Sequence, residues 1–104
     1  MTDYYNGKIA IAIRTARAAI GWSQQEFAEK MGVAKSTVAR IETLEMAVRA
    51  DFIMKAMRVF QGVGVELDLL TTDTIKVVVL EPGIFLATRK LKGSQEHTGD
   101  LKQP

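Results

Sequence analysis

Apolar residues recur at intervals of three and four along the first part of the chain, the spacing that places side chains on one face of an α-helix. One stripe predicts a helix over residues 7–20, ended by Gly21, and consists of Ile9, Ile13, Ala16 and Ile20. A second stripe predicts a helix over residues 50–60, before Gly62 and Gly64, and consists of Ile53, Ala56, Met57 and Phe60. Both stripes would face a common helical core.

Two shorter helical patterns lie between these stripes and are separated by a single glycine, Gly32. Ser23 followed by Glu26 predicts a capping box at the start of the first one. Ala28 is small enough to let two helices cross closely, and Gly32 adopts the left-handed conformation of a sharp turn at little cost. Two short helices joined in this way are typical of a helix-turn-helix, which presents its second helix to the DNA major groove.

The apolar pattern changes to alternation after the fourth predicted helix. Residues 63–70 and 75–80 alternate or are rich in β-branched side chains, and the polar residues 71–74 lie between them. This arrangement predicts a β-hairpin.

The C-terminal part is expected to be less regular. Pro82 and Gly83 predict a second turn, after which residues 84–91 could add a short third strand. Residues 92–104 are polar and include two glycines and a terminal proline, so we expect a disordered tail.

The segment from Ile13 to Glu42, which reads IRTARAAIGWSQQEFAEKMGVAKSTVARIE, is similar to the phage-repressor (Cro/cI, XRE) helix-turn-helix family. The similarity covers about residues 9–63. Family members usually carry Ser or Thr where this chain has Ala34, and often Asn or Gly where it has Thr43 and Leu44. The first departure weakens the start of the recognition helix, and the second affects the usual phosphate contact after it.

Pattern and resemblance together predict a mainly α fold. A four-helix, repressor-like helix-turn-helix domain would occupy residues 1–62, followed by a C-terminal β-hairpin at residues 63–91 and the tail at 92–104. The resemblance implies that Gln24 donates to a DNA phosphate, and that Arg17 pairs with Glu42 to hold the third helix against the first. Trp22, just before the second helix, is expected in the core.

The outward side chains of the third helix are the expected readers of DNA sequence. Lys35 and Ser36 lie in its first turn and Arg40 shares their face, so these three are expected at base edges. Arginine can hold guanine through two parallel hydrogen bonds, although Arg40 could instead contact phosphate alone. The other outward residues expected at the DNA are Ala34, Thr37 and Thr43, the two threonines at phosphates.

The hairpin carries apolar residues on both faces, and an isolated two-stranded sheet is marginally stable in water. It could pack on its own helices, or it could pair with the same hairpin of a second subunit. A two-fold dimer would suit a helix-turn-helix protein that binds a near-palindromic operator. The residues expected in this dimer contact are Val65, Leu67, Leu69, Ile75, Val77, Val78, Val79 and Leu80.

The composition limits the catalytic and metal-binding sites that the chain can form. The 104 residues contain no cysteine, so the chain forms neither disulfides nor thiolate metal sites. The only histidine, His97, lies in the expected tail without clustered ligands, and no nucleophile–base pair or phosphate-binding glycine loop is evident. We therefore expect no enzyme activity, no metal and no cofactor.

Charge and hydropathy bear on the expected partner of the chain and on its location in the cell. The net charge is +2, with nine Lys/Arg against six Asp/Glu in residues 1–60 and five against six in residues 61–104. The basic excess thus accompanies the helix-turn-helix. No apolar run is long enough to span a membrane and the polar start is unlike a signal peptide, so we expect a cytoplasmic protein.

These observations favour a sequence-specific transcriptional regulator, most simply a dimeric repressor. One alternative is the antitoxin of a toxin–antitoxin pair, which would bind its own operator and hold a toxin protein through residues 84–91 or the tail. Another is a protein-interaction module whose helix-turn-helix has lost DNA binding.

Overall fold

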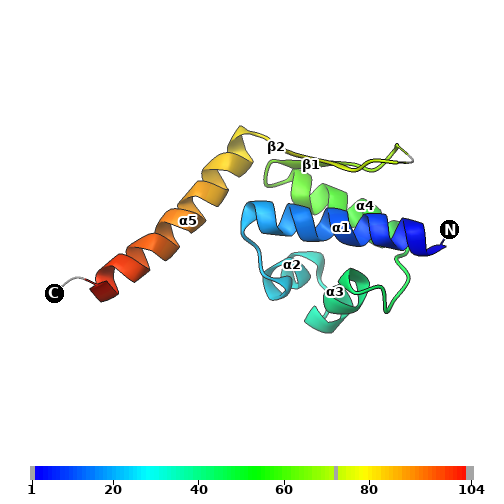
Figure 1. Ribbon diagram of the computed structural model, residues 1–104, viewed down its shortest axis with the longest axis horizontal. Helices are drawn as coiled ribbons and strands as arrows, with labels where there is room; N and C mark the ends of the chain where they lie inside the picture. The colour runs from blue at the N-terminus through cyan, green and yellow to red at the C-terminus, as the bar shows by residue number, and fades with distance from the viewer. Residues whose placement is uncertain (1, 72, 103–104) are drawn as a thin grey trace.

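The computed structural model describes residues 2–71 and 73–102, and the side chains of residues 3–71 and 73–93. Within these ranges the chain forms five helices and one two-stranded antiparallel sheet (Figure 1). The helices are α1 (Thr2–Ile20), α2 (Gln24–Met31), α3 (Lys35–Glu42), α4 (Ala50–Gln61) and α5 (Glu81–Lys102). The strands are β1 (Val65–Asp68) and β2 (Lys76–Val79). Thr72 of the expected turn, the side chain of His97 and the last two residues of the expected tail lie outside the described residues.

Helices α1 to α4 form the bundle that the apolar stripes predict. Ile13, Ile20 and Phe60 from the two predicted stripes are almost completely buried in one core. Helix α1 begins at Thr2, ahead of its predicted start at residue 7. Its first turns expose Tyr4 and Tyr5, and a segment without a buried stripe gives no periodic signal.

Aromatic rings fill the centre of this bundle. The rings of Phe27 and Phe60 stack with their centroids 4.9 Å apart, and Trp22 stacks on Phe60 at 5.6 Å. Trp22 is buried, as its position before α2 predicted. The three rings come from α2, α4 and the loop between α1 and α2, so their contact fixes these elements relative to one another.

The hairpin packs one of its faces on its own helices. Val65 pairs with Val79 and Leu67 with Val77 across the sheet. Val65 and Leu67 are buried in the core of the domain, so they contact α1 and α4 and cannot also face a partner. On the opposite face Val78 is 44% exposed. The hairpin is therefore covered on one side only, and its other side remains open.

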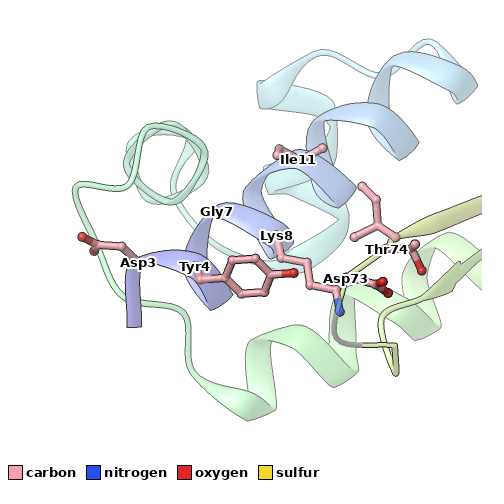
Figure 2. A pocket seen from close by; sticks show the side chains of 8 residues that line it. Asp3, Tyr4, Gly7, Lys8, Ile11, Asp73 and Thr74 are labelled. Carbon is pink, nitrogen blue, oxygen red and sulfur yellow. The ribbon is translucent and has the colours of Figure 1, made fainter. Parts of the chain in front are cut away.

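A lysine from α1 forms hydrogen bonds with the backbone at the turn of the hairpin. Lys8 Nζ donates to the backbone oxygens of Leu69, at 3.1 Å, and of Thr71. Figure 2 shows this side chain reaching from α1 toward the turn, with Tyr4 beside it. A cavity of about 350 Å³ lies here, lined mainly by α1 and by residues 73–75. Because Lys8 satisfies two carbonyls, it holds the turn to α1.

The expectation of a third strand at residues 84–91 is wrong, because this segment lies within α5. Pro82 stands in the first turn of that helix, where its missing N–H costs no hydrogen bond. Leu86, Ala87 and Lys90 are half-buried at helical spacing, facing the body of the protein. Helix α5 continues to Lys102, and so into the segment for which we expected a disordered tail.

Two glycines set the position at which α5 begins. Gly64 has a φ of +84°, and a Cβ there would collide with the backbone of Gly83. A Cβ on Gly83 would in turn lie 2.7 Å from the oxygen of Gly64. That same oxygen accepts a 2.7 Å hydrogen bond from the N–H of Leu80. The start of β1 and the start of α5 can approach this closely only because neither residue has a side chain.

Farther along α5, a lysine joins the helix to α2. Lys90 Nζ lies 2.7 Å from Glu26 Oε2, and the alkyl chain of Lys90 passes over Gly21. The hydrogen bond from Lys90 is the main cause that lowers the pKa of Glu26, followed by the backbone hydrogen bond from Ser23. Helix α5 is thus attached to the bundle at its start and again beside α2.

The first prediction concerns Leu44, which follows α3. Its φ is +64°, in the left-handed region, and its side chain is exposed. A side chain with Cβ is strained in this conformation, and asparagine tolerates it better than leucine. We expect Leu44→Asn to raise the free energy of unfolding by about 0.5–1 kcal/mol, measured by chemical denaturation. Leu44→Ala is the control, since it also removes the exposed apolar side chain but has no polar group that can hydrogen-bond locally in the left-handed conformation. An equal gain in Leu44→Ala would show that removal of an exposed apolar side chain, and not relief of backbone strain, is the cause.

The second prediction concerns the pKa of Glu26. Because this pKa is lower in the folded protein than the ordinary value of 4.5, the contact contributes stability above 4.5 and loses it as the pH falls through the folded-state pKa. Lys90→Met should raise the pKa of Glu26, measured by NMR titration of its carboxyl group, and should flatten the acid limb of the stability curve. Lys92→Met removes the same charge from an exposed position two residues away, on the opposite side of the helix, and should leave that pKa unchanged. Equal shifts in both variants would contradict a direct contact.

Candidate nucleic-acid interface

Helix α3 presents the polar face that the sequence predicted. Val38 and Ile41 are buried against the bundle. Lys35, Ser36 and Arg40 are exposed on the outside of the helix. Of the other expected DNA contacts, Ala34 and Thr43 are exposed, and Thr37 and Gln24 are half-buried. The described surface of α3 therefore carries two cations and a hydroxyl, the donors that suit acceptors on base edges and phosphates.

The two ends of α3 differ from the family pattern, as the sequence indicated. Ala34 occupies the N-cap position and supplies no side-chain hydrogen bond. At the other end the hydroxyl of Thr43 lies 2.9 Å from the oxygen of Ala39 and 2.7 Å from Glu45 Oε2. Because a hydroxyl has one proton, Thr43 can donate to a phosphate only by leaving both of these acceptors. The carboxylate of Glu45 also disfavours a phosphate at that point.

A buried ion pair holds α3 against α1. Arg17 Nε and Nη2 each lie 2.9 Å from one oxygen of the Glu42 carboxylate, which confirms the pair that the family resemblance implied. The side chain of Glu42 is only 3% exposed. Arg17 Nη1 also donates to the backbone oxygen of Trp22 at 3.0 Å. This two-pronged geometry fixes both the position and the rotation of the end of α3.

Gln24 belongs to the same network. Its Nε2 donates to Glu42 Oε1 at 3.0 Å, a contact that the sequence did not suggest. An amide nitrogen carries two N–H groups, so a second donor is left for another acceptor. Gln24 is the first residue of α2, where backbone N–H groups and the helix dipole favour an anion. A phosphate at this end would therefore meet a side chain whose orientation Glu42 already determines.

The start of α2 and the turn after it have the predicted geometry. Ser23 Oγ accepts from the N–H of Glu26 at 3.0 Å, and Glu26 Oε1 accepts from the N–H of Ser23 at 2.9 Å. Gly32 ends the helix with a φ of +70°. Ala28, at the crossing of α2 and α3, is completely buried. These features fix the start of α2 and the turn that leads from it to α3.

Lys90 is a charged residue at this surface that the sequence analysis did not single out. It comes from α5, far away in the sequence, and contacts the third residue of α2, Glu26. A sequence signal for a charged contact exists in the closely spaced basic residues Arg89, Lys90 and Lys92. It carries little weight in a segment for which we expect the end of a strand and the start of a tail.

Other kinds of site find little support in the part of the chain that the structure describes. It contains no group of three or more His, Cys, Asp or Glu side chains that could hold a metal ion. None of its helices is both long and apolar enough to cross a membrane.

Comparison with known proteins agrees with this geometry. A helix-turn-helix family model matches residues 13–67, more than half of the chain, and spans α2, the turn and α3. No curated protein matches the chain. No solved structure matches it either. The match covers the capping box, the turn at Gly32 and the Arg17–Glu42 pair. The chain belongs to the helix-turn-helix DNA-binding family of the phage-repressor (Cro/cI, XRE) type.

Proposed function

We propose that the protein is a dimeric transcriptional regulator, most simply a repressor, that binds a near-palindromic operator. The observation that carries the proposal is the exposed face of α3, on which Lys35, Ser36 and Arg40 lie while Glu42 anchors the helix from behind. Lys35, Ser36 and Arg40 would contact base edges in the major groove. Phosphate contacts from Gln24 and Thr37 would supply sequence-independent affinity. The regulator needs no cofactor for this activity.

The dimer is proposed to form through the open side of β2 and the start of α5. Four apolar side chains in this region are each 40–60% exposed. We call them the β2–α5 strip: Val78, Leu80, Ile84 and Phe85. Ile84 donates its N–H to the oxygen of Leu80, so strand and helix are continuous at this point. A stable dimer buries about 800 Å² per partner, of which the strip would be the apolar centre. Val77 and Val79 lie on the covered side.

An antitoxin is the second candidate function, and a specific observation favours it. Helix α5 extends beyond the bundle (Figure 1), and Leu91 on it is 73% exposed. A helix with exposed apolar side chains suits the groove of a protein partner. Co-purification with a stoichiometric protein partner from cells that carry the neighbouring genes would favour this function. A module without DNA binding, the remaining alternative, predicts no salt-sensitive association with any duplex.

The third prediction separates base contacts from phosphate contacts. Arg40→Ala should cost about 1–3 kcal/mol on an operator selected from a random pool, and little on random-sequence DNA. Gln24→Ala should weaken binding to both, because a phosphate contact carries no sequence information. A competition titration measures the two affinities. Lys76→Ala is the matched control, since Lys76 is an exposed cation on the hairpin, across α1 from α3 (Figure 1). Equal losses on both DNAs would reduce Arg40 to a phosphate contact.

The fourth prediction tests the β2–α5 strip. Val78→Lys should dissociate the dimer because it places two like charges at the contact, and operator affinity should fall steeply. The monomer should stay folded, since Val78 is exposed and pairs across the sheet with Glu66, a suitable partner for lysine. Sedimentation and circular dichroism measure both properties.

Met54→Lys is the matched control for this experiment, because Met54 is an exposed apolar residue on α4. We expect that variant to remain dimeric. The opposite pattern, a monomeric Met54→Lys and a dimeric Val78→Lys, would move the contact to α4. A dimer should also protect two half-sites whose centres lie roughly 34 Å apart in a footprint.

A further inference from the structure

The cavity beside Lys8 lies between the first half of α1 and the turn of the hairpin (Figure 2). Its volume of about 350 Å³ is within the range of small-molecule sites, roughly 300–1,000 Å³. Residues of α1 line one side and residues 73–75 line the other. The hairpin is on the side of α1 opposite to α2 and α3 (Figure 1), so this cavity is separate from the expected DNA surface.

Gly7 lines the cavity with bare backbone. A glycine inside a helix lowers stability relative to alanine, and such a position usually has a steric reason. The fold supplies none here, because a Cβ on Gly7 would meet no atom of the described residues within 4 Å. The missing side chain instead keeps the cavity open, as a site needs where a ligand approaches the backbone closely.

The walls beside Gly7 are mainly apolar. Tyr4 and Ile11 come from α1 and are 52% and 55% exposed, and Ile75 faces the cavity from the hairpin side. Apolar walls with a few polar groups are typical of sites for small organic molecules. The aromatic ring of Tyr4 adds a face that attracts a positive charge.

The charges at the cavity favour a cation as well. Lys8 directs its ammonium group to the backbone oxygens of Leu69 and Thr71. Two carboxylates, those of Asp3 and Asp73, also line the cavity, and neither has an ion-pair partner among the described residues. The lining therefore carries two negative charges against one positive charge that is already hydrogen-bonded.

We propose that this cavity is a binding site for a small organic cation with an apolar, aromatic body. The body would contact Ile11, Ile75 and the backbone at Gly7, while the positive charge would lie between the ring of Tyr4 and the carboxylates. A ligand held by both α1 and the turn would stabilise the folded protein by mass action. The proposal concerns a second site and does not depend on DNA binding.

Benzyltrimethylammonium is a suitable probe, because it combines an aromatic ring with a fixed positive charge. Phenylacetate is its anionic counterpart of similar size. In NMR titrations of the full chain at constant ionic strength, the cation should shift the amide signals of Gly7, Lys8 and Thr74. Phenylacetate should bind more weakly. The temperature of unfolding should rise with the concentration of the cation.

Gly7→Leu fills the cavity and should abolish binding of the cation. Leucine is the better helix former, so this variant should be at least as stable as the wild type, which separates loss of the site from loss of the fold. Thr15→Leu is the matched control. It adds the same side chain at an exposed position of α1 outside the lining and should bind as the wild type does.

The carboxylates are tested separately. Asp3→Asn and Asp73→Asn should each weaken binding of the cation by about 2–5-fold, the usual range for an exposed ion pair. Neither change should weaken binding of phenylacetate. Glu66→Gln is the control, since it removes an exposed carboxylate of the hairpin that does not line the cavity.

Unchanged affinity in Gly7→Leu would overturn the site, and phenylacetate binding as tight as that of the cation would overturn the class of ligand. Absence of binding of either probe to the wild type would overturn the inference as a whole. Sedimentation of Gly7→Leu tests another occupant: a variant that is monomeric, from a dimeric wild type that binds no probe, would assign the cavity to a second copy of the chain. Failure of the wild type to bind DNA would overturn the proposed function and leave this inference standing.

Discussion

The buried contact between Arg17 and Glu42 is the interaction on which the arrangement of the DNA-binding unit depends. Two 2.9 Å hydrogen bonds join the guanidinium to the carboxylate, and Gln24 adds a third donor to Glu42. Burial of two charges has a desolvation cost that only such complete pairing offsets. Loss of Arg17 would leave the carboxylate of Glu42, whose side chain is 3% exposed, without its cation, at a cost of about 3–5 kcal/mol. The geometry of α3 relative to α1 and α2 is therefore strongly determined.

This network also explains how α2 and α3 can act as one unit. Glu42 closes α3, whose outward side chains suit base edges, and the same carboxylate orients Gln24 at the start of α2. A phosphate bound at α2 and a base contacted by α3 would then have a fixed separation. Pre-organisation of this kind reduces the ordering cost of binding. The ring contacts of Trp22, Phe27 and Phe60 support the arrangement from the core side.

Much of the helix-turn-helix could be predicted because its signals are local. The capping box at Ser23, the left-handed Gly32 and the inward pair Val38 and Ile41 each follow from residues a few positions apart. The Arg17–Glu42 pair is long-range, and it was accessible only through the resemblance. The contact of Gln24 with Glu42 gave no sequence signal, because it depends on how two helices meet in space.

The C-terminal part shows why local patterns fail. A short apolar run such as residues 84–91 suits either a strand or a helix, and periodicity alone does not distinguish them. Pro82 and Gly83 were interpreted as a turn, whereas Pro82 lies in the first turn of α5 and Gly83 packs on Gly64. That packing is a tertiary contact between residues far apart in the chain. The side of the hairpin that is covered was likewise set by α1 and α4, not by the alternation itself.

The proposed dimer contact and the contact between α5 and α2 lie on one helix. Its first turn carries Ile84 and Phe85 of the β2–α5 strip, and its next turns carry Lys90 beside Glu26. Gly64 accepts from the N–H of Leu80 and packs against Gly83, so the start of α5 cannot shift without moving the sheet. A helix is stiff over this distance, and a partner that displaces its first turn also displaces Lys90. A second subunit that shifts this turn would thus also shift Lys90 against Glu26.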